Sequence, residues 1–208
     1  MDLKLNEYIR EVRSSNPTPG GGSVSALGGA LASSLVIMVS SLSKSKKIYR
    51  QTLEDDVKKV YDENLEKLTK LSNRLASLVE LDCDAFNKVA NAYKISKDNN
   101  NRDIQIQNSL KQASEVPLET CSTILDSIKL LYFYIDKTIQ SAITDLGCAC
   151  ALFHSSFYGA SLNVKTNLES IEDKEYVNST LEQLENMENE MYNVEGKIYS
   201  IIKGVMKY

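Results

Sequence analysis

Hydrophobic residues recur every three or four positions through most of the chain, with polar residues between them. The longest stripe consists of Leu68, Leu71, Leu75, Leu78, Asp82, Phe86, Val89 and Tyr93. This spacing lets one face of an α-helix pack against a neighbour. No segment of the sequence shows the alternation of apolar and polar residues between turn pairs that indicates strands. The pattern predicts helices over residues 3–12, 24–43, 52–95, 104–114, 117–136, 143–168 and 174–206.

Helix-breaking residues are concentrated near the N-terminus. Five of the nine glycines lie between Gly20 and Gly29, and only one of the three prolines, Pro117, lies beyond residue 19. Pro117 has no backbone N–H to donate, so we expect it to open a new helix after a break. In the last predicted helix, we expect five acidic residues to lie on a solvated face: Glu182, Glu185, Glu188, Glu190 and Glu195.

The segment 24–43 is apolar and rich in glycine, alanine and serine, and no charged residue occurs from Ser14 to Ser43. Its length is that of a membrane span. Its small residues favour instead a central helix that its neighbours approach closely, with Ser23 as the N-cap. The sequence therefore predicts one all-α domain over residues 1–208. This domain is a bundle of about six or seven helices around a buried central helix, and a membrane anchor is the minor alternative.

Charge and cysteine content disfavour several classes of protein. The chain has 24 basic and 28 acidic residues, and its net charge of −4 argues against a nucleic-acid-binding protein. The N-terminus lacks a basic stretch followed by an apolar run, and the four cysteines fit free thiols, so we expect a cytoplasmic protein. The single histidine, His154, has no second ligand pair at metal-binding spacing. We expect it to pack, and we expect no metal site.

Two features of the sequence point to chemistry. Asp82 occupies a position on the apolar stripe where a hydrophobic residue is expected, and burial there would raise its pKa toward the range useful for acid–base catalysis. The glycines Gly20, Gly21 and Gly22 precede a helix, where bare backbone and free N–H groups can accept a ligand. Each feature also has a structural interpretation, as an ion-paired or rim carboxylate and as a flexible turn.

Three polar side chains are weaker candidates. Asn163 and Asn167 are one turn apart near the end of an apolar helix, where their amides could hydrogen-bond a heterocycle or, equally, a facing helix. Asp145 lies at a helix start, where capping is the ordinary role.

Motifs along nearly the whole chain occur in the order of a known family. The run from Asn16 to Ala26 reads NPTPGGGSVSA, and the later matches are Leu78, Val79, Asp82, Ala85, Phe86, Lys97, Arg102, Gln107, Val116, Pro117, Leu118, Asp145, Gly159, Ala160, Asn163, Val164, Asn167 and Leu168. Together they resemble the cyclodeaminase domain of formimidoyltransferase-cyclodeaminase and the stand-alone methenyltetrahydrofolate cyclohydrolases that share it. The chain departs from the family at Ser96, which replaces a proline, and in lacking the Gly-Asn pair before Thr144 and Asp145.

The resemblance implies an all-α homodimer acting on a folate substrate, with or without a polyglutamate tail, and no cofactor beyond that substrate. It implies that Asp82 shuttles protons, that Lys97 or Arg102 binds the glutamate carboxylate or tunes Asp82, and that Asp145 hydrogen-bonds the pterin edge. The residues implied to bind the substrate are Pro19, Gly20, Gly21, Gly22, Ser23, Arg102, Asn163 and Asn167.

The first reaction implied is a cyclodeaminase reaction, from 5-formimidoyltetrahydrofolate to 5,10-methenyltetrahydrofolate and ammonia. The alternative is a cyclohydrolase reaction, which opens 5,10-methenyltetrahydrofolate to 10-formyltetrahydrofolate. The missing Gly-Asn pair motivates a third possibility, a helical folate-binding or scaffold dimer without catalytic activity.

Overall fold

In the computed structural model, which describes residues 4–206, the chain forms six α-helices and two short helical turns, with no strand in that range. In chain order they are α1 (Leu5–Val12), α2 (Gly21–Lys44), the π-helical turn η1 (Ile48–Thr52), α3 (Asp55–Tyr93), α4 (Arg102–Tyr134), the 3₁₀ turn η2 (Gln140–Ala142), α5 (Ile143–Leu168) and α6 (Lys174–Met206). The prediction of an all-α bundle is confirmed.

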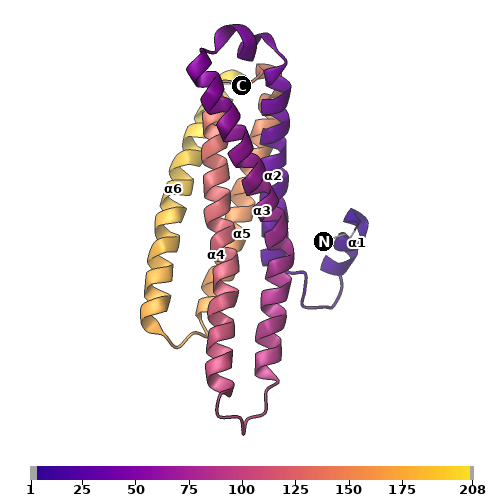
Figure 1. The fold of residues 1–208 in the computed structure, drawn as a ribbon, viewed down its shortest axis with the longest axis vertical. Coiled ribbons are helices and arrows are strands. Elements are labelled where there is room, and N and C mark those ends of the chain that lie inside the picture. Colours follow the sequence, from indigo (N-terminus) through magenta and orange to yellow (C-terminus); the bar gives the residue numbers. More distant parts are fainter. Residues whose placement is uncertain (1–3, 207–208) are drawn as a thin grey trace.

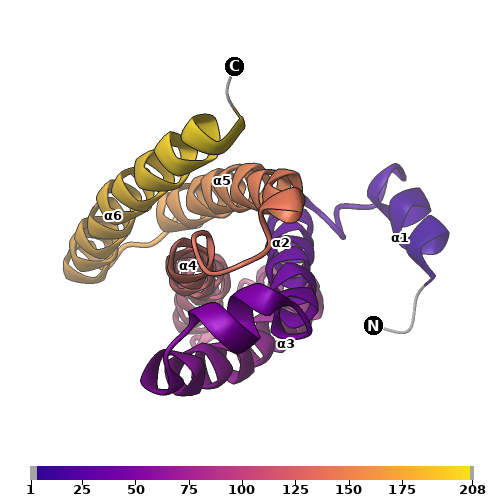
Figure 2. The ribbon, with the colours of Figure 1, turned by 90° about the horizontal axis from the view of Figure 1, so that it is seen from above.

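The long helices α2 to α5 run side by side as a bundle, as Figure 1 and Figure 2 show. The last helix, α6, packs on α4 and α5. The first helix, α1, lies on the α2 side of the bundle and is joined to it by the loop 13–20 (Figure 2). The apolar stripes of α3, α5 and α6 meet in one hydrophobic cluster that includes Leu75, Phe153 and Ile198.

Small residues let α2 sit among α3, α4 and α5. On the α5 side, a Cβ added at Gly28 would overlap Ser156 Oγ, and one added at Gly159 would overlap Ser25 Oγ. A serine of each helix therefore packs directly against a glycine of the other helix. Because glycine has no side chain, the two backbones lie close together. Among residues 4–206, α2 alone is long and apolar enough to cross a membrane, but 56% of its apolar window is buried within the protein. This burial confirms the prediction that α2 is a core helix.

Helix boundaries differ from the prediction at three places. Helix α2 begins at Gly21, with Gly20 as its N-cap, so Ser23 is inside the first turn and does not cap it. The region expected to break before Pro117 is one continuous helix, α4. The predicted helix 52–95 is shorter, because η1 occupies its beginning and α3 starts at Asp55.

The sequence predicts Glu195 on a solvated face. In the structure this residue is only 8% exposed, so that prediction is wrong. Its Oε2 lies 2.8 Å from Nδ1 of His154, whose side chain is 58% exposed. His154 is therefore an exposed partner of a buried carboxylate between α5 and α6, whereas the sequence predicts a packing role for it. Hydrogen bonding explains how the acid is tolerated there, since a buried carboxylate requires a partner.

Candidate active site

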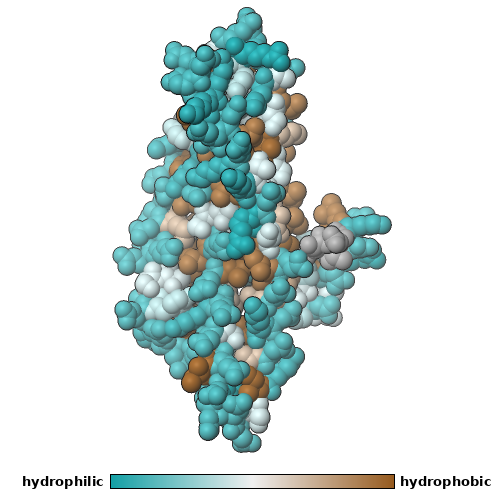
Figure 3. All heavy atoms as spheres, viewed as in Figure 1, coloured by the Kyte–Doolittle hydropathy of each residue, from teal (hydrophilic) through white to brown (hydrophobic). Residues whose placement is uncertain are grey.

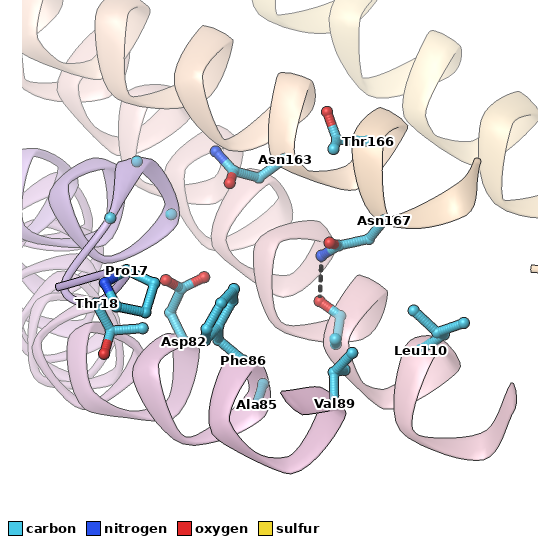
Figure 4. Close-up of a pocket in the computed structure, with 14 residues that line it drawn as sticks. Pro17, Thr18, Asp82, Ala85, Phe86, Val89, Leu110, Asn163, Thr166 and Asn167 are labelled. Carbon is cyan, nitrogen blue, oxygen red and sulfur yellow. Dashed lines mark hydrogen bonds between the residues drawn. The ribbon is translucent and has the colours of Figure 1, made fainter. Parts of the chain in front are cut away.

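A pocket of about 310 Å³ opens where the N-terminus of α2 meets the last third of α3, the first half of α4 and the end of α5. The residues that line it are Pro17, Thr18, Gly20, Gly21, Gly22, Asp82, Ala85, Phe86, Val89, Leu110, Ala113, Asn163, Thr166 and Asn167. In Figure 4, Asp82 and Phe86 rise into this space from α3, and Asn163 points into it from α5. The pocket thus unites the two strongest candidates, the triple glycine and Asp82.

The carboxylate of Asp82 lies directly against the backbone of Gly22. A Cβ added at Gly22 would overlap Oδ1 of Asp82, so only glycine leaves room for the acid here. Burial raises the pKa of Asp82, and a hydrogen bond from the backbone N–H of Ser23 lowers it in part. The net effect is a raised pKa, because desolvation disfavours the charged form more than one N–H stabilises it. This group can therefore accept and return a proton more readily than an ordinary aspartate.

Ser23 holds the acid from the side of α2. Its side chain is completely buried, and its hydroxyl lies 3.0 Å from the hydroxyl of Tyr8 on α1. Tyr8 is thus linked through Ser23 to Asp82, a connection across 74 positions of sequence that periodicity does not reveal. Ser23 is absent from the pocket lining and contacts Asp82, and its predicted contact with a ligand stays a prediction.

Asn163 and Asn167 both line the pocket, yet each amide already has a partner. Asn163 Nδ2 donates to the carbonyl of Gly159 at 2.8 Å. Asn167 Nδ2 donates to the carbonyl of Ala113 at 2.7 Å (dashed line in Figure 4). Ala113 is the residue whose carbonyl Pro117 leaves without its usual helical donor. Asn167 therefore supplies the missing hydrogen bond, which explains why α4 continues through the proline.

Four other predicted site residues lie outside the pocket lining: Pro19, Lys97, Arg102 and Asp145. Pro19 follows a cis peptide bond in the loop before α2. Lys97 is exposed in the connection between α3 and α4. No observation tests its role toward a ligand, which stays a prediction.

Arg102 has a structural role at the end of α3. Its Nε donates to the carbonyl of Ile95 at 3.0 Å and one terminal nitrogen donates to that of Tyr93 at 3.3 Å. Asp145 lies 18 residues before Asn163 on the same helix, a separation of roughly 27 Å at 1.5 Å per residue. Asp145 therefore lies far from this pocket within its own chain, and its predicted contact with a pterin stays a prediction.

Sequence reasoning missed the apolar wall of the pocket. Phe86, Val89 and Leu110 line it, and Phe86 keeps 44% of its surface exposed. The stripe on α3 contained both Phe86 and Val89, so an aromatic residue one turn after Asp82 was a usable signal. Leu110 and Thr166 come from other helices, and no local pattern marks them.

The pocket has the chemistry of a site for a planar polar ring. Asp82 is its single ionisable lining residue, and among residues 4–206 no group of three or more histidine, cysteine, aspartate or glutamate side chains could hold a metal. Apolar side chains form one wall and backbone at Gly21 and Gly22 forms another. A flat ligand could stack on the wall, approach the bare backbone closely and exchange a proton with Asp82.

Comparison with known proteins agrees with this arrangement. The sequence profile described as Formiminotransferase-cyclodeaminase matches residues 4–186. Methenyltetrahydrofolate cyclohydrolase of Methylorubrum extorquens is 32% identical, over 96% of this chain and 95% of that protein. Formimidoyltransferase-cyclodeaminase of Rattus norvegicus is 27% identical over 90% of this chain, which spans only 34% of that protein.

A solved structure is also similar throughout. The crystal structure of formiminotetrahydrofolate cyclodeaminase from Thermotoga maritima matches with a TM-score of 0.88 and 29% identity, covering 99% of this chain and 98% of that one. The similarity thus includes both the bundle and the glycine-rich start of α2. The chain belongs to the formiminotransferase-cyclodeaminase family of folate enzymes.

Proposed function

We propose that the pocket binds a tetrahydrofolate derivative and catalyses chemistry at the one-carbon unit between N5 and N10. The first reaction is that of a cyclodeaminase, acting on the 5-formimidoyl group. The observation that carries the proposal is the position of Asp82, a carboxylate of raised pKa that projects into the pocket against the bare backbone of Gly22. The named relatives support the class of substrate.

In this reaction N10 attacks the carbon of the protonated formimidoyl group and gives a tetrahedral carbon bonded to N5, to N10 and to the departing amino group. Asp82 takes the proton that N10 loses and returns a proton to the amino nitrogen. The carbon–nitrogen bond then breaks, ammonia leaves and the methenyl cation remains. One residue can perform both transfers, because the two nitrogens are attached to the same carbon. Phe86 and Val89 would support the pterin or benzoyl ring.

The second candidate is the cyclohydrolase reaction. Here Asp82 takes a proton from water as the water attacks the methenyl carbon, and it returns that proton to N5 when the carbon–N5 bond opens. The remaining hydroxyl proton leaves to solvent as the formyl C=O forms. The similarity over nearly the full length of the Methylorubrum extorquens protein favours this candidate. Both reactions pass through a tetrahedral carbon between N5 and N10, so one site can serve either.

The test is to offer each folate to the purified protein. Ammonia release reports the first reaction, and loss of methenyl absorbance reports the second. Asp82→Asn should reduce turnover by roughly 10²–10⁴-fold, because the amide cannot accept the proton. Asp84→Asn is the matched control, since this aspartate is exposed on the same helix and absent from the pocket lining. Near-normal turnover by Asp82→Asn would remove Asp82 from the mechanism.

The same assay decides the third alternative, a non-catalytic module. A protein that binds a folate and turns over neither substrate would support it, and the missing Gly-Asn pair before Thr144 and Asp145 motivates it. We propose in addition that the protein is a cytoplasmic homodimer and that its substrate can carry a polyglutamate tail. These statements extend the family resemblance to this chain.

A further inference from the structure

The two asparagines that line the pocket from α5 make hydrogen bonds of different kinds. Asn167 donates to the carbonyl of Ala113, which has lost its helical donor to Pro117. Asn163 donates to the carbonyl of Gly159, four residues before it in the same helix. Inside an α-helix that carbonyl already accepts the backbone N–H of residue 163. The side-chain bond of Asn163 is therefore not needed to satisfy the helix, and its effect falls on the amide itself.

The bond to Gly159 fixes which atom of the Asn163 amide faces the pocket. A carbonyl can only accept, so the nitrogen of the amide must lie toward Gly159, at 2.8 Å from its oxygen. Figure 4 shows the amide oxygen turned to the side of Asp82 and Phe86. Among residues 4–206, this oxygen has no hydrogen-bond donor. The pocket thus contains an open acceptor that its own helix holds in place.

Consecutive glycines of α2 receive the two polar groups. A Cβ at Gly22 would overlap Oδ1 of Asp82, and a Cβ at Gly21 would lie 3.2 Å from Nδ2 of Asn163. The carboxylate from α3 and the amide from α5 therefore approach adjoining positions at the start of one helix.

Both groups offer oxygen atoms to the same small space. Hydrophilic residues cover most of the face seen in Figure 3, whereas no lysine, arginine or histidine of residues 4–206 lines the pocket. Two oxygens without a neighbouring cation are suited to a ligand group that has at least two hydrogens to donate, and to one with positive charge.

We propose that Oδ1 of Asn163 accepts a hydrogen bond from the atom that leaves or attacks at the one-carbon unit, while Asp82 exchanges a proton with the substrate beside it. This inference rests on the proposed function and adds a second contact to it. In the cyclodeaminase reaction the atom is the amino nitrogen, which has two hydrogens before Asp82 returns a proton and three afterwards. In the cyclohydrolase reaction it is the oxygen of water, with one hydrogen toward each acceptor. Asn163 is a catalytic residue in this account, because it touches a reacting atom.

The first test removes the amide at nearly constant side-chain size. Asn163→Leu should lower kcat/KM roughly ten- to hundredfold, the factor that a hydrogen bond to a charged group represents. Its free energy of unfolding should not fall, because the helix still supplies a donor to Gly159. Ser155→Ala is the matched control, since its hydroxyl also bonds a carbonyl of α5 and the residue is exposed and absent from the pocket lining. It should keep full turnover.

The second test asks which part of the folate the amide touches. Tetrahydrofolate has neither the one-carbon unit nor the departing amino group. Its Kd, measured by calorimetry, should therefore be the same in wild type and Asn163→Leu, because the lost contact is made only with the reacting atom. Asn163→Ala adds no apolar bulk to the pocket and should show the same separation of turnover from binding.

Equal losses of turnover and of tetrahydrofolate binding would place the amide against the pterin and overturn the proposal. A fall in the free energy of unfolding that accompanies the lost turnover in both variants would overturn it too, since the amide would then be structural. If Asn163→Leu has wild-type turnover while Asp82→Asn is inactive, this inference fails and the proposed function stands. A wild-type protein that turns over neither folate would overturn both.

Discussion

The pairing of Asp82 with Gly22 shows how two residues create one carboxylate of raised pKa in a pocket. A carboxylate on a helix stripe would ordinarily be excluded by its neighbours, because burial without partners is costly. Here the absent side chain at Gly22 leaves a place for it, and the N–H of Ser23 provides a single donor. An added methyl group at Gly22 would therefore disturb the carboxylate of Asp82.

Replacing Gly22 with alanine should displace Asp82 and lower turnover on the order of 10²-fold, the effect of about 1 Å of misplacement. The reason is steric, since the new Cβ would overlap Oδ1. Gly196→Ala is the control, because nothing lies within 4 Å of a Cβ there. That variant should keep full activity and gain roughly 0.5–1 kcal/mol of stability. Steady-state kinetics and thermal unfolding measure both, and full activity of Gly22→Ala would contradict this account.

The raised pKa of Asp82 also has a consequence for stability. Above the ordinary aspartate value of 3.8, the unfolded chain loses this proton while the folded protein retains it. The folded state then binds more protons, so the contribution of Asp82 to the free energy of unfolding falls as pH rises through that range. Asp82→Asn should remove this contribution and be more stable than wild type at pH 7. Urea unfolding at several pH values measures the difference, which should shrink toward pH 3; a constant difference would contradict the raised pKa.

At the scale of elements, a hydrogen bond from α5 replaces the one that Pro117 removes from α4. The carbonyl of Ala113 has lost its usual donor to the proline, and Asn167 of α5 replaces it at 2.7 Å. The side-chain amide of Asn167 thus lies beside the pocket because it hydrogen-bonds to α4. A helix that sequence rules divide into two is continuous because a residue 50 positions later completes it.

Asn167→Ala should lower the free energy of unfolding by about 1–3 kcal/mol, since it leaves a buried carbonyl unpaired. The loss should be smaller when Pro117 is also replaced by alanine, because residue 117 then donates its own N–H to Ala113. A double-mutant cycle by denaturant unfolding measures this coupling. Equal losses in both backgrounds would show that Asn167 acts elsewhere.

At the scale of the whole molecule, the pocket lies toward one end of the bundle and a cluster of aromatic side chains lies toward the other. The end distant from the pocket holds an aromatic cluster in which Tyr61 and Tyr134 meet edge to face, with ring centroids 4.6 Å apart. The hydroxyl of Tyr134 donates to the carbonyl of Tyr61 at 2.6 Å. Tyr134 lies 21 residues beyond Ala113 on α4, or roughly 32 Å along the helix. The aromatic cluster therefore contributes to stability at a distance from the pocket.

Tyr134→Phe should therefore cost about 0.5–1.5 kcal/mol of stability through the lost hydrogen bond, and leave kcat/KM unchanged. Tyr192→Phe is the control, because this tyrosine is 78% exposed. It should alter neither stability nor turnover. Calorimetry and steady-state assays on both variants provide the comparison, and a large loss of activity in Tyr134→Phe would show that the two ends are coupled.

The sequence alone determined the helical character of the chain, the central place of the segment rich in glycine, alanine and serine, and Asp82 and the triple glycine as two separate places to look for chemistry. These features depend on periodicity and on local breaker residues, which act over a few positions. The family motifs indicated the folate substrate.

Only the tertiary structure decided which candidates share a pocket. Arg102 is engaged by carbonyls at the end of α3, Asp145 is distant along α5, and Tyr8 is connected to the acid through Ser23. It also showed that Asn167 completes α4 and that Glu195 is buried beside His154. The physical reason is common to all of these: each depends on which helix faces are brought together, and sequence spacing reports a face without reporting its neighbour.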